Sequence, residues 1–325
     1  MKHRPLTTTL LVTAVLALAL IAAIAFGGPG NPPPMPSINS PFKAVDFSQI
    51  PSQRSFKGAD GVDLYFREYR PRGEAVRGSA VLVHGSSASS NSMHPMAQAL
   101  AAAGLQVFAL DIRGHGSSGH KGQIDYIGQL ESDLQAFMQS VRPPSPATLV
   151  GFSSGGGFVL RVAGSRDRDL FHSYLLLSPY LGRDSPTQRP NSGGWISVGV
   201  PRAVGLYLLS SIGVSALNRL PVVRFALSDE ARSSLTPEYG FNLTMNFAPH
   251  RDFMADIRAA GTRVAVIAGD ADEAFDTSQL EAVVRGAGKN WPVRLLPGIG
   301  HIPLTLEPRA LESVAQQVRA LQHAV

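Results

Sequence analysis

Short apolar runs alternate with segments of helical periodicity from about residue 45 to the C-terminus, and this alternation constrains the fold more than any other feature. The later runs are almost continuously apolar, as expected for parallel strands that helices cover on both faces. The sequence therefore predicts a doubly wound, mostly parallel α/β sheet. The predicted strands lie at 55–57, 62–68, 79–83, 105–110, 147–150, 174–177, 263–268 and 293–296, and the predicted helices at 93–103, 126–141, 155–163, 278–285 and 307–322.

One long gap interrupts this alternation. More than eighty residues without a convincing core strand separate Leu177 from Arg263, which is too long for an ordinary connection in a compact domain. We expect residues 181–262 to form an inserted helical cap within an α/β domain that spans residues 46–325.

The N-terminal region differs in composition from the rest. Residues 6–26 carry no charge and are mostly Leu, Ala, Ile and Val, enough helix to cross a hydrocarbon core of roughly 30 Å. Lys2 and Arg4 precede this run and the next basic residue is Lys43, so the positive-inside rule leaves the N-terminus in the cytoplasm and the domain outside it. We predict a single-pass membrane protein with residues 1–26 as its anchor.

A signal peptide is the alternative for this region. Ala23, Ile24 and Ala25 resemble a small-residue cleavage site, and cleavage would release the domain as a secreted protein. The apolar run exceeds the roughly 7–15 residues of an ordinary signal peptide, which favours the uncleaved anchor. Pro and Gly are frequent after it, and we expect residues 27–45 to form an extended linker that does not pack.

A candidate nucleophile follows the predicted strand at 147–150. Gly151, Ser153 and Gly155 fit the pattern G-x-S-x-G, and a predicted helix follows. Glycine at both positions permits the close backbone approach of a strained strand-to-helix turn. Such a turn would expose the Ser153 hydroxyl and aim the Ser154 N–H at an oxyanion formed on the attacked carbon. The structural alternative is a glycine-rich turn with an idle serine.

A serine hydroxyl needs a base, and His301 lies just past the last predicted strand, where sheets of this kind build their sites. An acid that orients the histidine should lie between the two, since the order Ser, Asp, His is the one this fold uses. Asp272, after the penultimate strand, is our first choice. Asp270 is the second, Glu273 and Asp276 are further alternatives, and a role as a helix or turn cap is the structural alternative for either aspartate.

The second oxyanion donor is expected from the loop after the strand at 79–83. His84, Gly85 and Ser86 follow that strand, and we assign the role to the Ser86 N–H. We expect His84 to organise this loop by hydrogen bonding, because the base in such a fold lies downstream in the chain.

With these motifs the sequence resembles the α/β-hydrolase superfamily, in particular the branch of monoacylglycerol lipases, lysophospholipases and serine aminopeptidase-like proteins. The resemblance covers about residues 50–325 and implies a structural turn at 111–116. In this family His commonly precedes the nucleophile and Met or Leu follows it, whereas Phe152 and Ser154 occupy those positions here. This departure concerns the substrate that the resemblance implies and not the chemistry. The matching motifs lie at 84–86, 111–117, 151–155, 269–272 and 300–301.

Several other classes of site are disfavoured. The chain has no cysteine, which removes thiolate metal sites, iron–sulfur clusters and a cysteine nucleophile. Residues 114–119 fit G-x-G-x-x-G, but no helix opens directly after them and no acid follows at a strand end, as a dinucleotide site requires. We expect no cofactor and no metal. The net charge of +5 comes from scattered residues, so no nucleic-acid partner is expected.

The expected cap bears on the substrate. Residues 195–198 and 204–214 are largely apolar, and we expect lid helices whose underside holds an alkyl chain or another apolar acyl group. Packing for stability alone explains the same pattern. The cap holds eight Arg and six Asp or Glu residues, and this excess disfavours recognition of a free amino terminus.

These features predict a serine hydrolase that cleaves carboxylic esters of apolar acyl groups, with a small-molecule or lipid ester as substrate. A serine aminopeptidase-like peptidase is an alternative enzyme. A catalytically silent hydrolase fold that binds a ligand or partner at the membrane is the alternative from another class.

Overall fold

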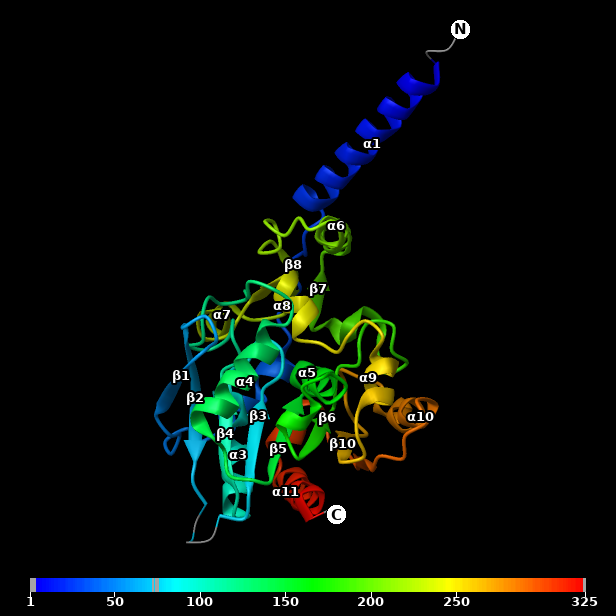
Figure 1. Cartoon of the computed structure of the whole chain (residues 1–325). Coiled ribbons are helices and arrows are strands. Elements are labelled where there is room, and N and C mark those ends of the chain that lie inside the picture. Colours follow the sequence, from blue (N-terminus) through cyan, green and yellow to red (C-terminus); the bar gives the residue numbers. More distant parts are fainter. Residues whose placement is uncertain (1–3, 72, 74–75, 324–325) are drawn as a thin grey trace.

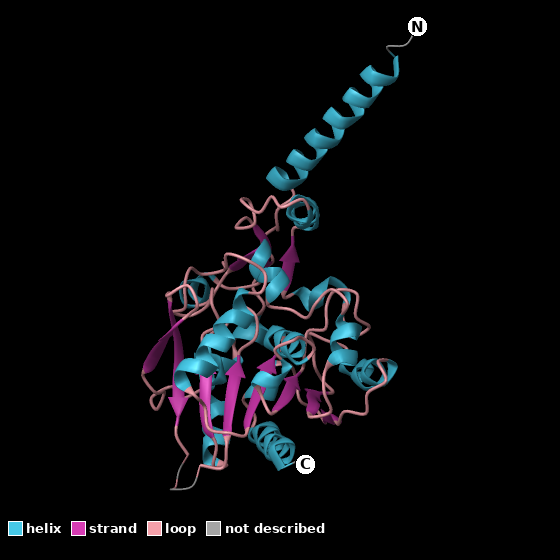
Figure 2. Cartoon of the chain, viewed as in Figure 1, coloured by secondary structure: helices cyan, strands magenta, loops and turns pink. Residues whose placement is uncertain are grey.

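The computed structural model describes residues 4–71, 73 and 76–323. Its centre is an eight-stranded sheet in the order β1-β2-β4-β3-β5-β6-β10-β11, with helices on both faces (Figures 1 and 2). The pairs β1–β2 and β2–β4 are antiparallel and the other neighbours are parallel, which confirms the predicted sheet. The strands are β1 (Gln53–Lys57), β2 (Asp63–Tyr69), β3 (Ser79–Val83), β4 (Gln106–Leu110), β5 (Ala147–Phe152), β6 (Ser173–Leu177), β10 (Val264–Gly269) and β11 (Val293–Leu296).

Two apolar layers hold the helices on the sheet. Successive strand residues point to opposite faces, so Val81 belongs to the layer under α4, α5 and α10, and Leu82 to the layer under α3 and α11. Every residue of β3 is buried, which explains why the parallel strands are continuously apolar. The core helices are α3 (His94–Ala102), α4 (Gln129–Val141), α5 (Ser154–Ala163), α10 (Leu280–Gly286) and α11 (Pro308–His323).

The strand register brings the loops of the expected site to one edge. Val83 at the end of β3 pairs with Leu110 of β4 and with Gly151 of β5. Because these strands are parallel and end at the same level, the loops that follow them meet at the carboxyl edge of the sheet. Short 3-10 turns occur between the longer elements: η2 (Ser90–Met93), η3 (Arg168–Leu170), η4 (Pro190–Gly194), η5 (Thr277–Gln279) and η6 (Ile302–Thr305).

The segment between β6 and β10 contains helices, as expected, and also a three-stranded antiparallel sheet in the order β7-β8-β9 that the sequence analysis did not predict. These strands are three to five residues long, too short to show a clear period of two. The last helix, α9, packs against α5 of the core. The elements are β7 (Ile196–Val198), α6 (Val200–Ser211), β8 (Pro221–Phe225), α7 (Asp229–Ser234), β9 (Glu238–Gly240), α8 (Phe241–Asn246) and α9 (Phe253–Ala259).

Helix α1 (Arg4–Phe26) projects away from the domain, and its last turns meet α6 (Figure 1). Within it, Thr8–Phe26 has a mean hydropathy of 2.7 and is long and apolar enough to cross a membrane. At the contact Ile24 is buried, and a Cβ on Gly205 of α6 would lie 2.7 Å from Ile24 Cγ1. Glycine in α6 therefore allows the two helices to approach closely.

Residues 27–45, which we call the strap, pack against the domain, so the expectation of a linker that does not pack is wrong. The Met35 N–H donates to Ala226 O (2.9 Å), and Arg224 Nη1 donates to the Asn31 side chain (2.8 Å). The strap is rich in Pro and Gly, yet it contacts the domain through backbone groups and a few side chains. Composition alone does not reveal such contacts. The strap contains α2 (Pro36–Asn39) and η1 (Pro41–Ala44).

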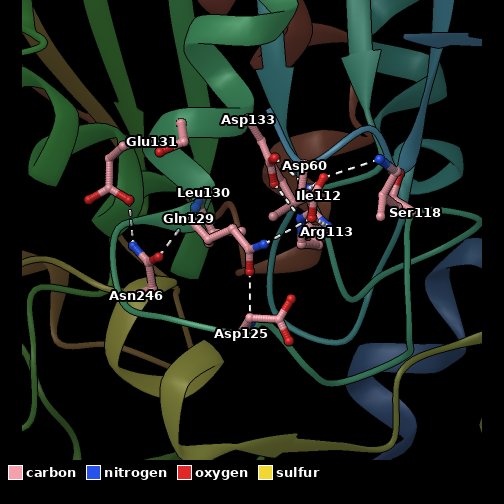
Figure 3. Close-up of polar contacts among 12 residues, drawn as sticks. Asp60, Ile112, Arg113, Ser118, Asp125, Gln129, Leu130, Glu131, Asp133 and Asn246 are labelled. Atoms are coloured by element: carbon pink, nitrogen blue, oxygen red, sulfur yellow. Dashed lines mark hydrogen bonds and ion pairs between the residues drawn. The ribbon is translucent and has the colours of Figure 1, made fainter. Parts of the chain in front are cut away.

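Buried charged side chains stabilise the turn after β4, at residues 111–116. This agrees with the structural role that the family resemblance implies for the turn. Asp111 accepts the Ser90 N–H (2.7 Å). Arg113, whose side chain is 5% exposed, pairs with Asp60 (2.8 Å) and with Asp133 (2.7 Å), as Figure 3 shows. The turn thus joins the β1–β2 hairpin to α4.

A second buried polar group ties the cap to the core (Figure 3). Asn246 of α8 accepts the Gly128 N–H (2.8 Å) and donates to Glu131 of α4 (2.6 Å). Glu131 also pairs with Arg161 of α5 (2.5 Å). The Asn246 amide therefore fixes the cap to the start of α4, and Glu131 links this contact to α5.

Candidate active site

Ser153 lies on the turn between β5 and α5, with φ 56° and ψ −119°, a backbone region that few residues other than glycine occupy. The turn brings backbone segments very close together. A Cβ on Gly155 would lie 2.6 Å from Val83 O, and a Cβ on Gly151 would lie 2.6 Å from Val159 Cγ2. The predicted strained turn is present, and this crowding explains both glycines.

The structure brings Ser153, His301 and Asp272 together. Ser153 Oγ lies 3.1 Å from His301 Nε2, and His301 Nδ1 lies 2.8 Å from Asp272 Oδ2. The three residues are 7%, 4% and 1% exposed. A serine, an imidazole and a carboxylate thus form one hydrogen-bonded chain whose hydroxyl end reaches a cavity.

Asp272 sits in an environment that keeps it ionised. Its second oxygen accepts the N–H groups of Ala274 (2.8 Å) and Phe275 (2.9 Å). Burial alone would raise the pKa of the carboxyl, but the charge and hydrogen bond of His301 and the Phe275 N–H outweigh burial and lower the pKa of Asp272 below its ordinary value. The carboxylate can therefore hold the Nδ1–H of His301 at neutral pH.

The other acids considered for this position have different partners. Asp270 accepts a backbone N–H from the loop before His301 (2.6 Å), and Asp276 accepts a hydroxyl group two residues along the chain (2.6 Å). Glu273 accepts the backbone N–H of His301 (2.9 Å) and so positions the loop, although it does not bond the ring. Geometry therefore favours Asp272 among the four.

Ser86 and Ser154, whose N–H groups are the expected oxyanion donors, lie close to Ser153. Ser86 and Ser154 line the same cavity as Ser153. Ser154 is the first residue of α5, so its N–H is one of those that lack an intrahelical acceptor. Trp195 Nε1 of the cap donates to Ser86 Oγ (2.9 Å) and holds that loop from the other side.

His84 organises the loop after β3, as expected. It is fully buried, its Nδ1 donates to Gly85 O (2.7 Å), and its Nε2 accepts the Ile112 N–H (3.3 Å). Burial lowers the pKa of His84, which keeps the ring neutral and able to make both bonds.

Tyr239 supports the same loop and was missed by the sequence analysis. Ser87 has φ 67°, and its N–H donates to Tyr239 Oη (2.6 Å). Burial raises the pKa of Tyr239, so its hydroxyl stays protonated. Tyr239 lies in β9 of the cap, far along the chain from the loop, and no motif marks it.

The cavity beside Ser153 has a volume of about 590 Å³, within the roughly 300–1,000 Å³ of small-molecule sites. Large apolar side chains line much of it, among them Phe152 at the elbow and Trp195 and Phe225 of the cap. The strap contributes as well. The described residues contain no group of three or more His, Cys, Asp or Glu side chains placed to hold a metal ion.

The stretch at 204–214 does not lie over the site as expected. No residue of α6 belongs to the described lining of the cavity, and Val204, Tyr207 and Leu208 are exposed. The reason is that α6 packs against α1, whereas shorter elements on either side of it cover the cavity. The apolar character of this stretch thus belongs to a different surface of the molecule.

Comparison with known proteins identifies relatives of this chain among hydrolases. The family described as serine aminopeptidase, S33, matches residues 74–309. A monoacylglycerol lipase of Mycolicibacterium smegmatis is 34% identical over 138 residues, which are 41% of this chain and 48% of the lipase. The match thus spans about half the length of that relative.

Solved structures share the fold. A soluble variant of monoglyceride lipase from Saccharomyces cerevisiae has a TM-score of 0.61 and 17% identity, covering 86% of this chain and 97% of that one. The monoacylglycerol lipase of Paleococcus ferrophilus has a TM-score of 0.59 and 19% identity, covering 80% and 98%. The family match extends over most of the α/β domain, and the chain belongs to the serine aminopeptidase S33 family of α/β-hydrolases.

Proposed function

We propose that this chain is a serine hydrolase that cleaves carboxylic esters of apolar acyl groups. The observation that carries the proposal is the hydrogen-bonded chain of Ser153, His301 and Asp272 beside an apolar cavity. A serine, a base and an orienting acid in this arrangement perform acyl transfer on several unrelated folds. The relative named monoacylglycerol lipase supports an acylglycerol-like ester.

Ser153 Oγ attacks the ester carbonyl carbon while His301 Nε2 accepts its proton. Asp272 holds the imidazole in the required tautomer and stabilises the imidazolium that forms. The N–H groups of Ser86 and Ser154 donate to the oxyanion of the tetrahedral intermediate. His301 then gives its proton to the leaving alkoxide, and a water molecule, deprotonated by the same base, hydrolyses the acyl-enzyme.

The charges around the cavity favour an ester over a peptide with a free amino terminus. Among the described residues that line it, Glu230 is the one acid, and it is exposed. Lys43 is the one lysine or arginine there. A buried acid would be expected if the site recognised an ammonium group.

The contacts of α1 support an uncleaved membrane anchor. Arg202 of α6 donates to Ile24 O (2.7 Å) and Ala25 O (3.0 Å), carbonyls at the end of α1. Cleavage after Ala25 would remove a helix end that the domain holds with specific bonds. We infer a single-pass protein with its N-terminus in the cytoplasm and its α/β domain outside.

The function is tested with the full-length chain in detergent, assayed on nitrophenyl esters of increasing acyl length. Hydrolysis should be abolished in Ser153→Ala and unchanged in Ser211→Ala, which replaces an exposed serine of α6. Equal rates in the native and Ser153→Ala proteins would reject Ser153 as nucleophile.

A fluorophosphonate probe separates the enzyme from a silent binding protein, because it reacts only with an activated serine. The native protein should be labelled once per chain, and Ser153→Ala should not be labelled. Absence of labelling in the folded native protein would favour a ligand-binding role.

A further inference from the structure

The strap forms one wall of the cavity that holds Ser153. Met35 and Phe42 are half-buried and line the cavity, and Phe47 just after the strap extends the same wall. All three precede residue 74, where the match to the family begins. This wall is therefore supplied by a part of the chain outside the family match.

The strap is held at both ends of this wall. At the cap, the Met35 N–H bonds Ala226 O (2.9 Å) just after β8. At the core, the Phe47 ring lies 5.9 Å from the ring of His94, the first residue of α3. Two fixed points on different parts of the domain hold the intervening residues against the cavity.

The side chains of Met35 and Phe42 are suited to an apolar partner. Met35 and Phe42 pack on one side against the buried cluster that α3 and α11 share, and they also face the cavity. An alkyl chain in the cavity would remove their remaining apolar surface from water, which is favourable. Met is also flexible enough to follow an irregular apolar ligand.

We propose that the strap is part of the substrate site, with Met35 and Phe42 contacting the acyl chain and setting which chain lengths are hydrolysed efficiently. This inference rests on the proposed ester hydrolysis. The strap continues directly from α1, so one continuous segment provides both the anchor and the acyl-binding wall. A chain that begins near Phe42 would lack part of its own binding site.

Kinetics of the full-length protein test this assignment. Met35→Ala and Phe42→Ala should each lower kcat/KM for long-chain nitrophenyl esters about tenfold, mainly through KM, because contact with a few methylenes of the acyl chain is lost. The kcat/KM for the butyrate ester, whose chain is too short to make this contact, should stay nearly unchanged. Val45→Ala is the matched control, since Val45 belongs to the strap but not to the described cavity lining. Equal losses at every chain length, or no loss, would overturn the proposal.

Thiol labelling tests binding without catalysis. The chain contains no cysteine, so Met35→Cys, Phe42→Cys and Val45→Cys can each be labelled uniquely in a Ser153→Ala background. A long-chain alkyl glyceryl ether should slow maleimide labelling at positions 35 and 42 and leave position 45 unchanged. Identical rates with and without the ether at all three positions would reject the strap as a binding wall.

The two measurements separate the inference from the function on which it rests. If the native chain hydrolyses no ester, the proposed function fails, and the labelling experiment alone decides whether the strap binds an apolar chain. If the chain hydrolyses esters but the strap variants keep the native chain-length profile, the function stands and the inference fails.

Discussion

At the scale of single residues, the site depends on how its acid is placed. Asp270 and Asp272 stand two positions apart in the sequence, and motif position favoured Asp272 without excluding Asp270. In the structure Asp272 is 1% exposed and bonded to the His301 ring, whereas Asp270 bonds a loop amide at the surface. Their substitutions should therefore have very different effects.

Asp272→Asn should lower kcat about 10⁴-fold with little change in KM, because asparagine would favour the wrong tautomer of His301. Asp270→Asn should keep activity within about twofold, as expected for an exposed group that touches no reacting atom. Steady-state kinetics on one ester substrate compares the two. Full activity in Asp272→Asn would remove Asp272 from the mechanism.

The lowered pKa of Asp272 also predicts a pH dependence of stability. Because the folded pKa lies below the unfolded value of about 3.9, the ionised carboxylate stabilises the fold above that pH, and this contribution is lost as the pH falls through the folded pKa. The difference in unfolding free energy between the native protein and Asp272→Asn should be constant from neutral pH to about pH 5 and shrink below about pH 4. Urea unfolding across this range measures it, and a difference that persists undiminished in acid would contradict the assignment.

At the scale of elements, the β5–α5 junction and the turn after β4 are the most constrained parts of the core. The first depends on close backbone contact and the second on buried charge. In both, one element contacts backbone or charged groups of an element far away in the sequence, so a substitution at either place should lower the stability of the whole domain.

Gly155→Ala should destabilise the protein by about 1–3 kcal/mol and reduce activity, because the added methyl group would overlap the backbone after β3. Gly261→Ala is the matched control, since nothing lies within 4 Å of its Cβ position. Thermal unfolding of both variants tests this. Equal melting temperatures would show that the junction is less crowded than described.

Arg113→Met should cost about 3–5 kcal/mol of unfolding free energy, because Asp133 would remain buried without its partner. Arg219→Met is the comparison, because the pair Arg219–Asp125 is largely exposed and such pairs contribute about 0–1 kcal/mol. Urea unfolding at neutral pH gives both values. A small loss in Arg113→Met would indicate that water reaches the buried pair.

At the scale of the whole molecule, the N-terminal segment is joined to the cap. Arg202 bonds the end of α1, and Arg224 and Ala226 hold the strap. Helix α1, the strap and the cap therefore form one connected unit. Its integrity can be tested without any substrate.

The purified protein should have the mass of the full chain, with residues 1–26 retained, and should stay in the membrane fraction after alkaline extraction. In detergent, Arg202→Ala should be cut by chymotrypsin after the exposed Phe26 faster than the native protein, because two hydrogen bonds to the end of α1 are lost. A native mass that lacks residues 1–25 would identify a cleaved signal sequence instead.

Local pattern was sufficient to predict the parallel strands, the strained turn at Ser153 and a downstream histidine that lies next to Ser153. These features depend on short-range constraints: a buried strand must be apolar, and a crowded turn must carry glycine. The three short cap strands and the start of α4 were less clear. Helix α4 was predicted to begin at residue 126 but begins at Gln129. Gly128 has φ 107°, and a residue in this conformation lies outside the helix.

The sequence by itself determined the fold class, the order of the site residues along the chain and the presence of an apolar N-terminal helix, because composition and periodicity record which residues must be buried. Tertiary structure alone decided that Asp272 faces the His301 ring, that Tyr239 supports the loop after β3, that α6 lies against α1 and that the strap lines the cavity. Each of these depends on contacts between segments far apart in the chain, and a polar or proline-rich segment carries no local signal of the partner it meets.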